Sequence, residues 1–181
     1  MEFRVKLSRD TGVDLPADAC AQLLGLNFTG LDGEEITLQS NPGRFYACLG
    51  VEIAEQARLA GRSDKLYFAM WLYRQAAEIH NNPEGMRMIA MCYMSGQGVL
   101  VKEDPSNPVQ AVFWLRKASD LGDADAQALL GTILLSGNAL AGVEKDAARA
   151  VALFTEAGED YFLGMCYLEA GAYTRPLFSS T

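Results

Sequence analysis

The chain has 181 residues, half of them hydrophobic, and a formal net charge of −8 at pH 7. A chain of this size can bury a core without metal ions or disulfides. The acidic balance argues against nucleic acid as a partner, because phosphate binding needs clustered Lys and Arg side chains, and no apolar run approaches the roughly 18 residues typical of a transmembrane helix.

Residues 1–43 are predicted to form a small α/β extension. Apolar and charged residues alternate over Phe3–Leu7, which predicts a half-buried strand, and Glu35–Gln39 is a second predicted strand. Two such strands are marginal alone. We therefore expect them to pack on the first long helix or to pair with the sheet edge of another protein.

A short helix is predicted between these strands, over Leu15–Gly25. Asp14 is the candidate N-cap, Pro16 lies in the first turn, and Gly25 ends the helix.

A short motif then recurs over residues 44–171. It places an apolar residue before a glycine or alanine, with a large apolar residue three positions later. Its copies are Leu49-Gly50-x-x-Ile53, Ile89-Ala90-x-x-Tyr93, Leu130-Gly131-x-x-Leu134 and Leu163-Gly164-x-x-Tyr167. Glycine inside a helix costs about 1 kcal/mol relative to alanine, so we expect close approach of a neighbouring helix to offset that cost. A period of roughly 35 to 45 residues is typical of helical solenoids.

The segments between the motifs repeat as well. Each carries small or apolar residues at three- and four-residue spacing, which indicates one apolar helix face, and Ala69, Ala111 and Ala150 occupy equivalent positions. Every unit is therefore predicted to be an antiparallel pair of helices, A then B. Helices A are expected at residues 44–60, 84–95, 125–136 and 159–170, and helices B at 64–80, 108–121 and 146–157.

These residues resemble a known repeat family. The matching positions are Gly96-Gln97-Gly98-Val99, Asp104, Ala111, Trp114, Lys117-Ala118 and Leu130-Gly131. Their order is similar to that of the Sel-one-like repeat (SLR), a branch of the tetratricopeptide-type (TPR) helical repeats, and the resemblance covers roughly residues 44–170. It implies a mainly α fold, an α-α solenoid of about three and a half hairpins over 44–171, with an irregular tail at 172–181.

The resemblance also implies a function. Proteins of this kind act as non-enzymatic protein–protein interaction scaffolds or adaptors, which suggests a peripheral subunit of a larger assembly. In the family's geometry the helices A line the concave face, so Tyr46, Arg87, Tyr93, Gln127 and Tyr167 are the predicted contacts with a peptide or a basic protein surface.

Two departures from the pattern lie near the C-terminus. The link from Ala157 to Gly164 is about six residues shorter than that from Ala118 to Gly131, which indicates either a shortened third helix B or a shifted alignment. The last helix A also lacks a partner, because the following residues have no helical period and include Pro176. An uncapped end predicts a partner site, a dimer contact or a truncation; Tyr173, Pro176 and Phe178 are its predicted contact residues.

The sequence predicts no catalytic residue, cofactor or metal site. Cys20, Cys48, Cys92 and Cys166 show no Cys-x-x-Cys spacing, and His80 is the single histidine, so the cysteines are interpreted as buried thiols. Two alternatives stay open. One is an enzyme with a pocket between the extension and the first helices that uses His80 or a cysteine. The other is a structural subunit of an organellar membrane or ribonucleoprotein complex, bound through the N-terminal strands.

Six methionines, Met70, Met86, Met88, Met91, Met94 and Met165, suit either core packing or a peptide groove. The first residues, with Glu2 and Arg4 after Met1, lack a secretory core and an Arg/Ser-rich transit stretch. We therefore expect a cytoplasmic protein, or one of an organelle matrix or stroma whose leader has been removed, and we do not expect secretion. Peripheral association with a membrane complex is compatible with this expectation.

Overall fold

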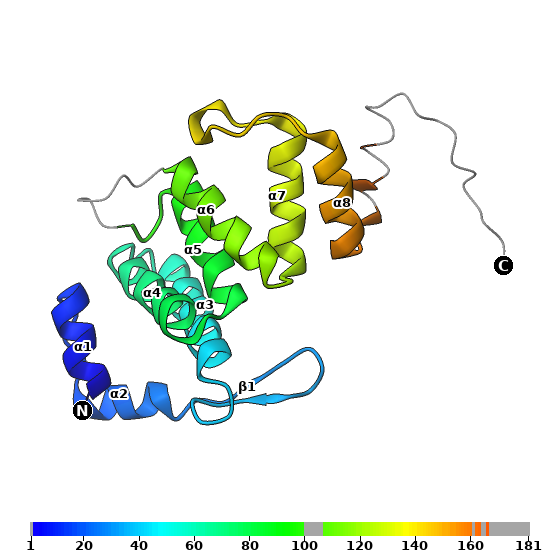
Figure 1. Cartoon of the computed structure of the whole chain (residues 1–181). Coiled ribbons are helices and arrows are strands. Elements are labelled where there is room, and N and C mark those ends of the chain that lie inside the picture. Colours follow the sequence, from blue (N-terminus) through cyan, green and yellow to red (C-terminus); the bar gives the residue numbers. More distant parts are fainter. Residues whose placement is uncertain (1, 100–106, 161, 164–165, 167–181) are drawn as a thin grey trace.

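The structure is a computed structural model that describes residues 2–99, 107–160, 162–163 and 166. Within this part of the chain, six helices form three consecutive pairs (Figure 1). The pairs are α3 (Pro42–Leu59) with α4 (Asp64–Arg74), α5 (Pro83–Ser95) with α6 (Pro108–Asp120), and α7 (Ala124–Ser136) with α8 (Ala147–Ala157). The predicted mainly α solenoid of helix pairs is confirmed.

Three of these helices start with the same pair of residue types, an asparagine followed by a proline. Asn41, Asn82 and Asn107 are N-caps whose side chains accept a hydrogen bond from a backbone N–H in the first turn, and each is followed by proline. Proline suits the first helical position because its fixed φ is helical and its missing N–H would have no helical partner there. Asp123 and Asp146 cap α7 and α8 in the same way.

Close packing explains the motif glycines. A Cβ built on Gly50 would lie 2.5 Å from Cε1 of Tyr73, and one built on Gly131 would lie 2.8 Å from Cε1 of Phe154. The predicted close approach of a neighbouring helix is thus confirmed in the first and third pairs, and the neighbour is helix B of the same pair.

The second pair reaches similarly close packing with side chains of different sizes. Counted from the equivalent alanines, Leu115 stands where the other pairs have Tyr73 and Phe154. Ala90 stands where they have glycine, and both Ala90 and Leu115 are fully buried in one core cluster. A smaller residue on helix B therefore goes with a larger one on helix A.

The N-terminal segment is a helix, α1 (Glu2–Thr11), and not the predicted strand. Phe3 and Leu7 are four residues apart and so share one helix face: Leu7 is fully buried, and the ring of Phe3 packs edge-on against Trp71 with centroids 5.4 Å apart. Val5 is 60% exposed. The alternation suggested a strand because Val5 was counted as part of a buried face to which it does not belong.

The short helix predicted over Leu15–Gly25 is confirmed as α2 (Ala17–Leu24), with Gly25 as its C-cap. Asp14 does not cap it, because the N-cap is Pro16, and the Asp14 carboxylate instead forms an ion pair with Arg4 at 3.0 Å.

Only the start of the second predicted strand is extended, as β2 (Glu35–Ile36). It pairs antiparallel with β1 (Phe28–Thr29), which the sequence analysis missed. Ile36 is buried in the core beside α3.

The first helix B is not one regular helix. After α4 the chain widens into a π-helical turn, η1 (Gln75–Ile79), before His80. The start of α5 lies directly against this turn: a Cβ on Gly85 would be 2.6 Å from that of Ala76.

The short link that follows Ala157 is explained by the place where α8 ends. This helix ends at Ala157 with Gly158 in the left-handed region, whereas α6 continues past the equivalent Ala118 to Asp120. The third helix B is therefore shorter at its C-terminal end. Asp160, Phe162, Leu163 and Cys166 are helical, and the remainder of the predicted helix at 159–170 lies outside the described residues.

Candidate interaction surface

We call the outward faces of α3, α5 and α7 the helix-A surface; of these helices, α3 and α5 pack on each other. Its exposed side chains include Val51 and Glu55 on α3, Met91 and Met94 on α5, and Asp125 and Thr132 on α7. Val51, Met91 and Met94 are 40%, 43% and 49% exposed. Apolar side chains thus occupy its middle, and an acidic residue lies on the outer helix at each side.

The methionines divide between the two roles left open by the sequence. Met70 and Met86 are buried in the core, whereas Met91 and Met94 are exposed. Met91 follows the buried Ala90 and points away from the core face of α5. The sequence contained this signal, because a residue about 200° around the helix from the buried Ile89 must face outward.

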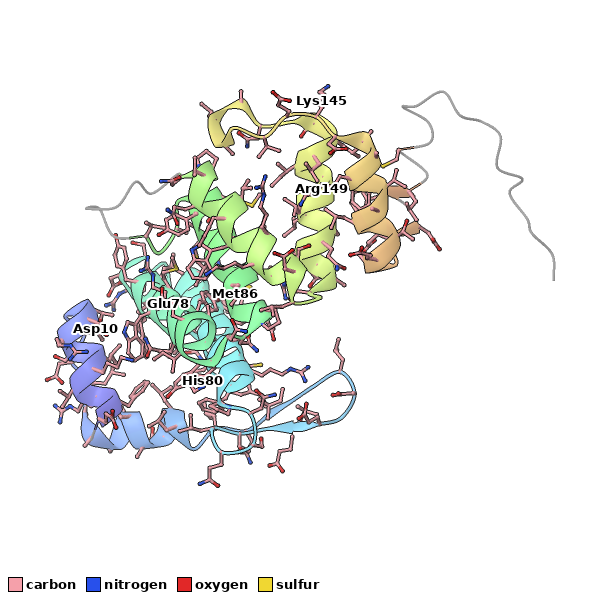
Figure 2. All side chains as sticks on the ribbon, in the orientation of Figure 1. Asp10, Glu78, His80, Met86, Lys145 and Arg149 are labelled. Atoms are coloured by element: carbon pink, nitrogen blue, oxygen red, sulfur yellow. The ribbon has the colours of Figure 1, made fainter. Side chains whose placement is uncertain are left out.

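Tyr46 lies between the extension and the end of the first pair. Its ring stacks on His80 with centroids 5.7 Å apart and on Phe3 at 6.4 Å, and Figure 2 labels His80 where η1 ends. Burial raises the pKa of Tyr46 above its ordinary value. Tyr46 therefore joins α1, α3 and η1, and is only half-buried.

Arg87 joins the second pair to the third. Its guanidinium contacts the carboxylates of Asp123 at 3.0 Å and Asp125 at 3.3 Å, and its side chain is 17% exposed. Asp123 also accepts the backbone N–H of Ala126 at 2.7 Å as the N-cap of α7. The Asp123 carboxylate thus caps α7 and, through its ion pair with Arg87, also anchors α5.

Tyr93 and Gln127 are buried. The Tyr93 hydroxyl accepts a hydrogen bond from Arg74 at 3.0 Å, and the Gln127 amide donates to Glu156 at 3.2 Å. Both link helix A to a helix B. Their role as partner contacts stays a prediction, as it does for Tyr46 and Arg87, and the other predicted contacts, Tyr167, Tyr173, Pro176 and Phe178, lie outside the described residues.

The thiols of Cys92 and Cys48 do not suit a nucleophile. A reactive cysteine needs a lowered pKa, but burial raises the pKa of Cys92 to about 11 and also raises that of Cys48. In the described part of the chain, no group of three or more His, Cys, Asp or Glu side chains is placed to hold a metal ion.

A pocket does lie between the extension and the first helices, where the enzyme alternative placed one. It is lined by residues of α2, α3 and the start of α4, and neither His80 nor any of the four cysteines is among its lining residues. Its side chains offer no nucleophile beside an orienting base, the arrangement that the alternative requires.

Searched over the described ranges, no helix has the length and apolarity that crossing a bilayer requires.

Solved structures with a similar fold include two repeat proteins. A Sel1 repeat protein from Oxalobacter formigenes is 24% identical, with a TM-score of 0.57 over 74% of this chain and 52% of that one. The protein c5321, a protective antigen of uropathogenic Escherichia coli with an SLR fold, is 29% identical, with a TM-score of 0.58 over 73% of this chain and 27% of that one. The chain therefore spans about half the length of the first protein and about a quarter of the second. No curated protein matches it.

The Sel1 repeat matches residues 62–80, 83–123 and 124–160, which together make up more than half of the chain. These segments contain α4 with η1, α5 with α6, and α7 with α8, whereas α3 lies ahead of the first match. Sel1 repeat proteins generally act as protein–protein interaction scaffolds, so the family suggests a non-enzymatic module with protein partners. On this match and on its fold, the chain belongs to the Sel1 repeat family.

Proposed function

We propose that the chain is a non-enzymatic adaptor that holds a partner protein against the helix-A surface, as a peripheral subunit of a larger assembly. The exposure of Val51 and Met91 on adjacent helices A carries this proposal. Methionine is flexible and polarisable, so it adapts to varied apolar side chains, and an amphipathic segment binds such a surface through its apolar face.

The partner segment is proposed to be apolar in its centre and basic at its edges. Glu55 and Asp125 flank the methionines, but each is paired with an arginine, Arg58 and Arg87, so the basic edges are argued from the net charge of −8 of the chain. Complementary charge of this kind speeds association and fixes orientation more than it adds affinity. Binding should therefore slow at high salt.

Docking through the N-terminal strands is less favoured. β1 and β2 pair with each other, and Ile36 is buried against the protein's own core. We place the adaptor in the cytoplasm or in an organelle matrix or stroma, which imaging of the tagged full-length protein would test.

Affinity capture with the substitution Met91→Glu tests the proposal. The matched control is Val109→Glu on α6, because Val109 is similarly exposed, at 54%, but lies on a helix B. The proposal expects Met91→Glu to lose a partner that the parent and Val109→Glu retain, with unchanged helicity in both variants. Retention of every partner by Met91→Glu, or the lack of any stable partner of the parent, would overturn it.

A further inference from the structure

A groove of about 520 Å³ separates the extension from the first helix pair. α1 packs on α4 and β2 packs on α3, so α2 spans the distance between these two anchors. The floor and walls are apolar, formed by Val13, Leu15, Leu23, Leu26, Ile53 and Phe68. A volume of this size is within the range of small-molecule sites.

The rim next to α4 is charged. Arg62 and Asp64 form an ion pair at 2.7 Å, and the hydrogen bonds from Arg62 lower the pKa of the Asp64 carboxyl, so the pair stays ionised and contributes no net charge. Lys65 adds one positive charge to the rim of a groove in an acidic protein. It lies three residues before the buried Phe68, and so on the same side of α4.

Polar, uncharged groups complete the rim. Gln22 on α2 and Gln56 on α3 line the groove and are exposed. The Gln56 amide already donates one N–H to Glu52 at 2.7 Å, and an amide has two N–H groups to donate. The residues that line the groove therefore combine an apolar interior with hydrogen-bond donors and one net positive charge.

We propose that this groove binds a small amphiphile with one anionic head group, such as a medium-chain fatty acid. The apolar chain packs against Leu23, Ile53 and Phe68, and the carboxylate lies at Lys65. Such a ligand would join α2 to the first helix pair, and it is independent of a protein partner on the helix-A surface.

The test is a titration of the full chain with decanoate below its micellar concentration, followed by calorimetry and by backbone NMR shifts. Decanol and decyltrimethylammonium are the neutral and cationic controls. Decanoate should bind most tightly of the three, with shifts concentrated in residues 13–26, 53–56 and 62–68. Absence of decanoate binding, or equally tight binding of decyltrimethylammonium, would overturn the proposal, and a groove that takes only an apolar side chain of a partner protein would bind none of the three.

Two variants test separately how the apolar interior and the charged rim contribute to decanoate binding. Ala19→Phe fills the groove and should abolish decanoate binding, whereas Ala21→Phe, at an exposed position of the same helix, should retain it. Lys65→Glu should weaken decanoate about fivefold and leave decanol unchanged, as expected for an exposed ion pair. Since Lys65 is exposed, this variant keeps the fold even if Ala19→Phe does not. Decanoate binding that neither variant weakens would place the ligand elsewhere and refute the assignment.

Discussion

The ring of Phe154 lies against both the backbone of Gly131 and the ring of Phe162. A Cβ at Gly131 would lie 2.8 Å from the Phe154 ring, and Phe162 stacks on Phe154 with centroids 5.0 Å apart. The ring therefore has little room to move away from a larger residue on α7.

Gly131→Ala should accordingly destabilise the protein, by about 1–3 kcal/mol, although alanine is the better helix former. Gly131→Leu should do so at least as strongly. Urea denaturation measures the free energy of unfolding. A Gly131→Ala protein as stable as the parent would refute the helix pairing.

The second helix pair supplies the compensating change. It combines Ala90 with Leu115, so adding Phe154→Leu to Gly131→Ala should recover part of the lost stability. Phe154→Leu alone should lower the free energy of unfolding by about 1–2 kcal/mol, since the smaller side chain leaves a cavity next to Gly131. Strictly additive losses in the double variant would show that the two residues do not share this space.

Two buried tyrosines are predicted to respond differently to the loss of their hydroxyls. The Tyr73 hydroxyl has no hydrogen-bond partner among the described residues, whereas that of Tyr93 accepts from Arg74. Tyr73→Phe should leave the free energy of unfolding unchanged or raise it by up to about 1 kcal/mol, and Tyr93→Phe should lower it by about 1 kcal/mol. Denaturation of both variants in parallel checks this, and the reverse order would contradict the described contacts.

Arg87→Ala should cost about 1–2 kcal/mol. Its partner Asp123 is only 11% exposed, so the pair is intermediate between surface and buried ion pairs. The control is Arg58→Ala, because Arg58 pairs with Glu55 at a site where both side chains are more than half exposed, and the expected change there is below about 0.5 kcal/mol. If both variants lose the same stability, Arg87 does not join the second and third pairs as described.

Cys92 should make stability depend on alkaline pH. Burial raises the pKa of the folded thiol to about 11 from its ordinary value of 9.0, so the unfolded chain releases this proton at lower pH. The protonated Cys92 thiol contributes on the order of 2 kcal/mol to the free energy of unfolding. This contribution is complete below pH 9 and is lost as the pH rises through 11. Denaturation at several pH values, compared with Cys92→Ala, isolates the effect. Identical pH profiles would contradict it.

The sequence predicted the helix pairs because their signals are local. A glycine in an apolar helix and an alanine series at helical spacing both report on packing within one hairpin, as Gly131 and Phe154 show. α1 was missed for the opposite reason. The face of a short segment is decided by what covers it, and the residues that cover Phe3 and Leu7 lie on helices far along the chain.

The same limit applies to the predicted partner contacts, whose surroundings also depend on residues far away in the sequence. Tyr93 and Gln127 are polar residues on helices A, and spacing alone cannot tell whether such a side chain faces a partner or the protein itself. Arg74, which contacts Tyr93, is 19 residues earlier, and Glu156, which contacts Gln127, is 29 residues later. The groove beside α2 could not be predicted either, because it depends on how the extension lies across the first pair.

The extension is translated before the surface on which it packs. Lys6 contacts Gln75, 69 residues further on, and Asp10 contacts Trp71, 61 residues further on (Figure 2 labels Asp10). While the ribosome makes the intervening residues, Phe3 and Leu7 have nothing to cover them, and such apolar surface on a nascent chain is what chaperones recognise. α1 should thus reach its native position only after α4 and η1 have been made.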